Sequence, residues 1–154
     1  MSERPHVLVI EDGHEYSESL GRFLSEHFAF TRAGDGPEAL ALLSQRAFCA
    51  IFLDMRFDRA APERLLGDLD EATERFSGDR DQARRFLENN QGAYILAAVR
   101  AAGHRTAVVW SYDFDGEPRR WKHMEKAYAP LAYLSDSASP QEIRQTLERA
   151  CAHP

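Results

Sequence analysis

Short apolar runs alternate along this chain with longer stretches in which apolar residues recur every three or four positions. One run of six apolar residues covers positions 48–53 and is followed by Asp54. Such a run predicts a strand buried on both faces of a parallel sheet, although periodicity alone leaves a short helix open. Asp54 would then lie at the carboxyl end of a central strand, the edge where open α/β sheets bind ligands. The alternative is a loop aspartate that only follows the strand.

The same pattern predicts four more strands, with helices between them. The strands cover residues 6–10, 29–33, 106–110 and 131–134. A helix is expected at about 14–27, with Leu20, Phe23 and Leu24 on its inner face. Other helices are expected to follow Pro37, Gly92, Pro118 and Ser139. This alternation predicts an α/β fold with a doubly wound (βα)5 parallel sheet of five strands.

The segment between the third strand and the next helix, about residues 56–91, interrupts the alternation. It holds many charges and no strand pattern, so we expect a helical insertion. An apolar stripe after Pro62 predicts one helix, and Asp79 followed by Gln82 resembles the capped start of a second. The apolar stripes could form a small satellite core or a groove for a partner. We also expect Arg56 to pair with Asp113 and to narrow access to Asp54.

Length and charge restrict the class of protein. A chain of 154 residues suits one domain, residues 1–154. The formal charge is 19 − 25 = −6, which argues against nucleic acid or an anionic membrane as the main partner. Cys49 and Cys151 suggest reduced thiols in a cytoplasmic protein. The sequence has no secretory signal pattern, no apolar stretch long enough to span a membrane, and no zinc-type spacing of its histidines.

The order and spacing of five short motifs resemble the receiver domain of bacterial response regulators. The motifs cover residues 7–12, 34–40, 51–55, 108–111 and 133–134, and together they extend over nearly the whole chain apart from the insertion. In that family an aspartate accepts a phosphoryl group from a histidine kinase, and acidic residues hold Mg²⁺. The resemblance therefore implies the flavodoxin-like receiver topology, with Mg²⁺ as the expected cofactor.

The resemblance also implies a role for each residue that matches a family position. Asp54 matches the phosphoryl acceptor, and Glu11 and Asp12 match the acidic pair that holds the metal. The backbone carbonyl of Arg56 would complete the metal shell, Ser111 matches the switch hydroxyl, and Tyr133 matches the switch aromatic residue. Carboxylate and carbonyl oxygens are hard ligands that suit Mg²⁺.

Three departures make this an atypical, pseudo-receiver-like sequence. Asp136 stands where the family has a lysine, so a cation that would neutralise the phosphoryl group is replaced by an acid. Tyr112 follows the switch hydroxyl at a position that is usually small. The third departure is the insertion itself. Asp136 could instead point to solvent, and Tyr112 could turn outward.

These observations favour a stand-alone receiver-like module of a two-component-type pathway that acts through protein contacts. Phosphorylation of Asp54 is expected to be impaired or absent. The expected partners are a histidine kinase or a downstream effector, with homodimerisation left open and with no nucleic acid or membrane. An alternative is a Mg²⁺-dependent phosphohydrolase with Asp54 as nucleophile, although Arg56 occupies the place of its usual second aspartate. A structural subunit with a vestigial site is the other alternative. We expect no enzymatic activity beyond self-phosphorylation from a phosphodonor.

Overall fold

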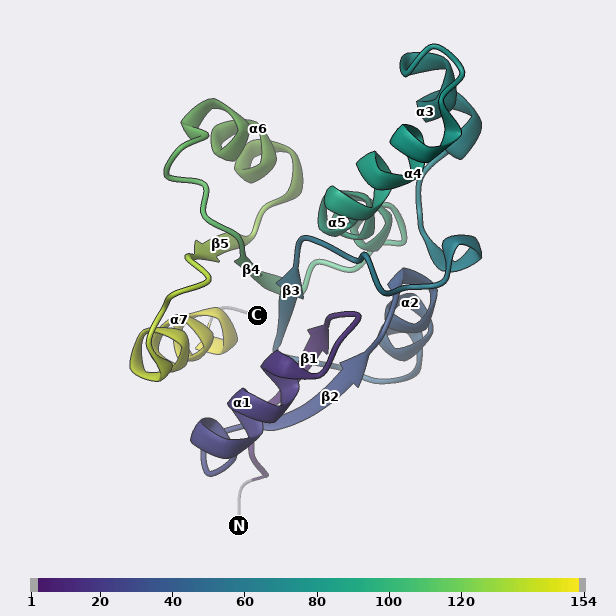
Figure 1. Ribbon diagram of the computed structural model, residues 1–154. Helices are drawn as coiled ribbons and strands as arrows, with labels where there is room; N and C mark the ends of the chain where they lie inside the picture. Colours follow the sequence, from purple (N-terminus) through teal and green to yellow (C-terminus); the bar gives the residue numbers. More distant parts are fainter. Residues whose placement is uncertain (1–2, 153–154) are drawn as a thin grey trace.

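A computed structural model describes residues 3–152, and at its centre is a five-stranded parallel sheet (Figure 1). The strand order is β2-β1-β3-β4-β5, and every neighbouring pair is parallel. The strands are β1 His6–Ile10, β2 Ala29–Ala33, β3 Ala50–Asp54, β4 Ala107–Ser111 and β5 Leu131–Leu134. The predicted doubly wound sheet is therefore confirmed, and the strand that ends in Asp54 is the central one.

Helices cover both faces of the sheet (Figure 1). One face packs against α1 and α7, and the other against α2, α5 and α6. The bounds are α1 Glu15–Leu24, α2 Gly36–Gln45, α5 Gln91–Ala101, α6 Pro118–Tyr128 and α7 Pro140–Ala152. Two apolar cores result, one on each side of a sheet whose three central strands are almost fully buried.

Helix α1 is shorter than predicted, and one of its residues was assigned to the wrong face. Leu20 and Leu24 are buried against the sheet, but the side chain of Phe23 is 56% exposed. The buried side of α1 follows an i, i+4 row from Tyr16 through Leu20 to Leu24. A position three residues beyond Leu20 falls outside so narrow a row, and Phe23 therefore faces solvent.

The predicted insertion is ordered and helical. It contains a short 3-10 turn at Pro62–Arg64, then α3 at Leu69–Arg75 and α4 at Arg80–Asn89. The predicted cap is confirmed, because Asp79 accepts the backbone N–H of Gln82 at 3.0 Å. The first helix is shorter than the apolar stripe that follows Pro62. Asp68 caps α3, so the helix begins only at Leu69.

The insertion forms a satellite core of its own. Ala72, Ala83 and Leu87 are buried between α3 and α4, with Tyr94 of α5 packed against them. The buried amide of Gln91 ties the start of the insertion to its end. Its Oε1 accepts the N–H of Leu66 at 2.7 Å, and its Nε2 donates to the carbonyl of the same residue at 3.0 Å. The satellite-core alternative is therefore the one observed.

The expectation of two reduced thiols is wrong in this structure. Cys49 precedes β3 and Cys151 lies near the end of α7, and their sulfurs are bonded at 2.04 Å. The packing of α7 on β3 and β4 brings the two residues together, which their separation in the sequence could not reveal. The argument for a cytoplasmic protein that used free thiols no longer applies. None of the helices within residues 3–152 is both long and apolar enough to cross a membrane.

Candidate functional site

Asp54 and Ser111 lie side by side at the carboxyl edge of the sheet, as register partners at the ends of β3 and β4. Both line an open cavity that the loops after β1, β3, β4 and β5 surround. The other lining residues are Asp12, Tyr16, Met55, Arg56, Asp58, Arg59, Tyr112, Asp113 and Asp136. Five of the residues in this cavity are aspartates and two are arginines, so its wall carries more negative than positive charge.

The carboxyl group of Asp54 is half-buried, and its neighbours do little to stabilise its negative charge. Its Oδ1 accepts the backbone N–H of Met55 at 2.8 Å. Burial is the main cause that raises the pKa of Asp54 to about 6, and the charges of Asp12 and Glu11 act in the same direction. The hydrogen bond from Met55 lowers this pKa but does not outweigh them. Positive charge placed beside Asp54 would therefore stabilise its ionised form.

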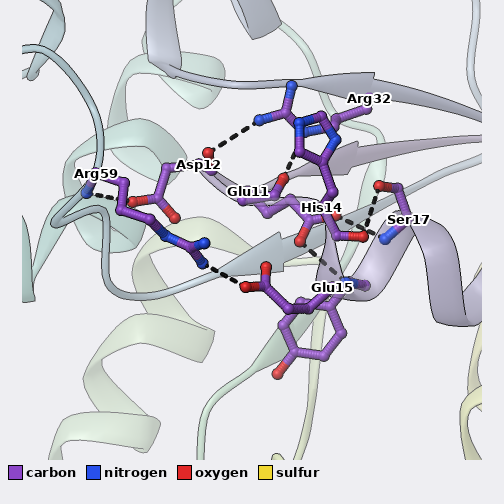
Figure 2. A network of polar contacts seen from close by, with 9 residues as sticks. Glu11, Asp12, His14, Glu15, Ser17, Arg32 and Arg59 are labelled. Carbon is purple, nitrogen blue, oxygen red and sulfur yellow. Dashed lines mark hydrogen bonds and ion pairs between the residues drawn. The ribbon is translucent and has the colours of Figure 1, made fainter.

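Glu11 directs its carboxylate toward helix α1 (Figure 2). The residue is almost completely buried. Its Oε1 accepts the backbone N–H of Tyr16 at 3.0 Å, and its Oε2 accepts the N–H of Ser17 at 2.6 Å. These amides belong to the first turn of α1, where backbone donors have no partner within the helix. The contact observed for Glu11 is thus that of a helix cap, and the residue does not line the cavity.

Asp12 reaches the cavity and is held there by an arginine from the insertion (Figure 2). Its Oδ2 accepts the backbone N–H of Arg59 at 2.6 Å. The guanidinium of Arg59 forms an ion pair with Glu15 at 2.8 Å, and a Cβ on Gly13 would collide with both of these side chains. From β2, Arg32 donates to the carbonyls of Asp12 at 3.0 Å and Gly13 at 2.6 Å. The loop after β1 is therefore fixed from two sides.

Tyr16 is a site residue that the sequence analysis missed. Its hydroxyl is hydrogen-bonded to Ser111 Oγ at 2.7 Å, and its ring packs on Phe52 with centroids 5.0 Å apart. Burial raises the pKa of Tyr16, so the phenol stays protonated at neutral pH. The available signal was that Tyr16 falls four residues before Leu20, on the inner row of α1.

The sequence analysis named two tyrosines, Tyr112 and Tyr133, and the hydroxyls of both are bonded to acids between β4 and α6. Tyr112 lines the cavity with its ring, and its hydroxyl donates to Glu117 at the start of α6. Tyr133 does not line the cavity, and its hydroxyl donates to Asp115 at 2.5 Å. The Tyr133 ring packs edge-on against Trp121 with centroids 4.6 Å apart. Both hydroxyls therefore bind acids of the segment that joins β4 to α6.

The remaining predicted residues lie at the rim. Asp136 is exposed but lines the cavity, as its position in the chain suggested. The predicted pair between Arg56 and Asp113 is wrong, because the Arg56 side chain forms no ion pair with any residue from 3 to 152. The Asp113 carboxylate instead accepts the backbone N–H of Asp115 at 2.9 Å. It is Arg59 that joins the insertion to the loop after β1.

The start of α5 packs closely against the backbone at the end of β3. The backbone N–H of Gly92 donates to the carbonyl of Met55 at 2.9 Å. A Cβ at Gly92 would collide with the carbonyl oxygen of Asp54 and lie 3.0 Å from the indole nitrogen of Trp110. Only glycine permits this close approach between helix and strand, and so Gly92 sets how tightly α5 packs behind Asp54.

The residues present fit Mg²⁺ only in part. Within residues 3–152, no three His, Cys, Asp or Glu side chains gather into a ready-made metal cluster. Asp12 and Asp54 nevertheless line one cavity with Arg56, and the charges of Asp12 and Glu11 add to the effect of burial in raising the pKa of Asp54. Mg²⁺ usually takes only one or two carboxylates and keeps several waters, which this donor set can satisfy.

No protein-family model matches the sequence, and no curated protein sequence matches it either. Solved structures do resemble it. The receiver domain of the Francisella response regulator 1452 superposes with a TM-score of 0.66 at 18% identity, covering 97% of this chain and 98% of that one. The NtrX receiver domain from Brucella abortus gives 0.66 at 16% identity, with 96% and 99% covered. The chain has the receiver fold.

Other structures with this fold carry different names. An adenylate cyclase from Rhodopirellula baltica gives a TM-score of 0.67 at 16% identity, covering 97% of this chain and 89% of that one. Identities this low establish the receiver fold and leave the chemistry of the site to its own residues. The predicted flavodoxin-like receiver topology is confirmed, with the helical insertion between β3 and α5 added to it.

Proposed function

We propose that this chain is a receiver-like signalling module of the two-component type, with Asp54 as its phosphoryl acceptor. The observation that carries the proposal is the placement of Asp54 at the end of the central strand, with Ser111 as its register partner in the same cavity. A carboxylate in this place can attack a phosphoryl group, and a neighbouring hydroxyl can donate a hydrogen bond to the phosphoryl oxygens.

Mg²⁺ would be held by the carboxylates of Asp12 and Asp54 and by the backbone carbonyl of Arg56. Glu11 supports this site indirectly, through its charge and through its cap on α1. When bound, the ion would offset the repulsion between the attacking carboxylate and an anionic phosphodonor. The electrostatic need for a cation is consistent with the raised pKa of Asp54.

Phosphorylation of this site is impaired in our proposal. Asp136 lines the cavity at the position where the family has a lysine, so the cavity has a carboxylate where the family supplies a cation. Of the two arginines at the rim, Arg59 is paired with Glu15, and the exposed side chain of Arg56 has no ion pair within residues 3–152 that would fix it beside Asp54. Transfer from acetyl phosphate would join a carboxylate oxygen of Asp54 to phosphorus and release acetate, but slowly.

The module acts through contacts with other proteins, a kinase or an effector, and not through turnover of a substrate. A phosphohydrolase that used Asp54 as nucleophile would need an acid two residues further on. Arg56 lies there, with an exposed side chain. A structural subunit with a vestigial site differs from our proposal in one measurable way, because it would bind neither Mg²⁺ nor a phosphoryl mimic.

Labelling with acetyl phosphate and Mg²⁺, followed by mass spectrometry of intact protein, tests the proposed function. We expect slow, partial addition of one phosphoryl group to wild type and none to Asp54→Asn. Robust stoichiometric labelling would show that the site is not impaired. A complete lack of both labelling and beryllofluoride binding would favour the vestigial subunit, and multiple turnover of the phosphodonor would identify an enzyme.

A further inference from the structure

Tyr16 is held in place at three points around the proposed acceptor site. Its backbone N–H is bound by Glu11, its ring packs on Phe52, and its hydroxyl lies 2.7 Å from Ser111 Oγ. Ser111 is only 5% exposed, yet it lines the cavity beside Asp54. A buried serine hydroxyl at this edge therefore has a fixed neighbour that comes from α1 rather than from the sheet.

The hydrogen bond between these hydroxyls has a preferred direction. A phenol is far more acidic than an aliphatic alcohol, so the tyrosine is the better donor and the serine the better acceptor. With Tyr16 donating to Oγ, Ser111 keeps its own proton for a different acceptor. The cavity next to Asp54 is the open side on which such an acceptor could bind.

We propose that Tyr16 is a positioning residue that orients the Ser111 hydroxyl toward an oxyanion attached to Asp54. The hydrogen bonds would then run from Tyr16 to Ser111 and from Ser111 to the oxyanion. Each bond in such a chain polarises the next and strengthens it. The pair supplies a neutral donor in a cavity where Asp136 repels anions. This role rests on the proposed function of Asp54.

The test is the affinity for beryllofluoride, which mimics an acyl phosphate, measured by ¹⁹F NMR with saturating Mg²⁺. The variants are Tyr16→Phe, Ser111→Ala and the double variant, with Tyr94→Phe as the matched control because this tyrosine packs on the satellite core and does not line the cavity. We expect Ser111→Ala to bind about tenfold more weakly, as for one lost hydrogen bond to a charged group, and Tyr16→Phe to bind more weakly by a smaller factor, because Tyr16 acts through Ser111. The double variant should bind no more weakly than Ser111→Ala alone, and the control should match wild type.

Tyr16→Phe keeps the ring on Phe52, so a role in packing alone would leave the affinity unchanged. Equal affinity of wild type and Tyr16→Phe, or losses that multiply in the double variant, would overturn the role of Tyr16 while the proposed function stands. A wild type that binds no beryllofluoride would overturn the proposed function, and this role with it. As a second readout, the ¹³Cζ signal of Tyr16 should shift on beryllofluoride binding in wild type and not in Ser111→Ala.

Discussion

The carboxylate of Glu11 is joined to the backbone amide of Ser17 by a hydrogen bond of 2.6 Å (Figure 2). An acid that the receiver resemblance assigns to a metal is thus committed to the start of α1. Because its other oxygen binds the N–H of Tyr16, both oxygens serve as caps for the helix. Stability and metal binding should therefore respond differently when Glu11 is changed.

We expect Glu11→Gln to lower the free energy of unfolding by about 1 kcal/mol, since glutamine keeps one acceptor oxygen and loses the other. Mg²⁺ affinity should fall much less in Glu11→Gln than in Asp12→Asn, whose carboxylate lines the cavity. Urea unfolding and calorimetric titration measure the two effects. A Glu11→Gln protein that keeps its stability but loses Mg²⁺ would make Glu11 a direct ligand.

Asp54→Asn should stabilise the protein above pH 6 and not below pH 4. The pKa of Asp54 is raised from 3.8 to about 6, so the folded state holds the proton more tightly than the unfolded state does. The stability from this group is complete below pH 3.8 and is lost as the pH rises through about 6. Asparagine avoids that loss, which is on the order of 1–3 kcal/mol.

Chemical unfolding of wild type and Asp54→Asn between about pH 4 and pH 8 measures the difference, and Mg²⁺ adds a second arm. The ion should stabilise wild type at neutral pH more than it stabilises the variant. A difference in stability that does not change with pH would contradict the raised pKa of Asp54.

Asp136→Lys should increase labelling by acetyl phosphate. The change replaces an acid at the cavity rim with a cation that can contact the phosphoryl oxygens, a kind of contact worth about 1.5–3 kcal/mol. Asp136→Asn is the matched control, because it removes the repulsion without adding a positive charge and should give a smaller increase. If both variants label at the wild-type rate, Asp136 is not the cause of the impairment.

Gly92→Ala should destabilise the protein by about 1–3 kcal/mol and disturb the acceptor site. The new methyl group would collide with the backbone of β3 at the carbonyl of Asp54, which cannot move without shifting the acceptor itself. Gly21→Ala in α1 is the control, because nothing lies within 4 Å of its Cβ position and alanine favours a helix. Thermal unfolding should separate the two variants, and equal stabilities would contradict the close approach at Gly92.

What the sequence could predict depended on short-range patterns. Apolar runs located the strands, and the caps at Asp79 and Ser139 follow from residues three positions apart. The placement of Asp54 and Ser111 at one edge followed from parallel strands alone. Contacts that depend on how a helix is rotated against the sheet were beyond such patterns. Tyr16 was missed for this reason, and Phe23 was assigned to the wrong face.

The bond between Cys49 and Cys151 spans 102 positions of the chain and so turns most of the molecule into a covalent ring. The ring contains β3, β4, β5 and the whole insertion. A protease that cuts the exposed turn at Ser77 and Gly78, between α3 and α4, would open the ring without releasing a fragment. The severed halves would separate on a denaturing gel only after reduction, so the insertion can be nicked while both ends stay attached to one molecule.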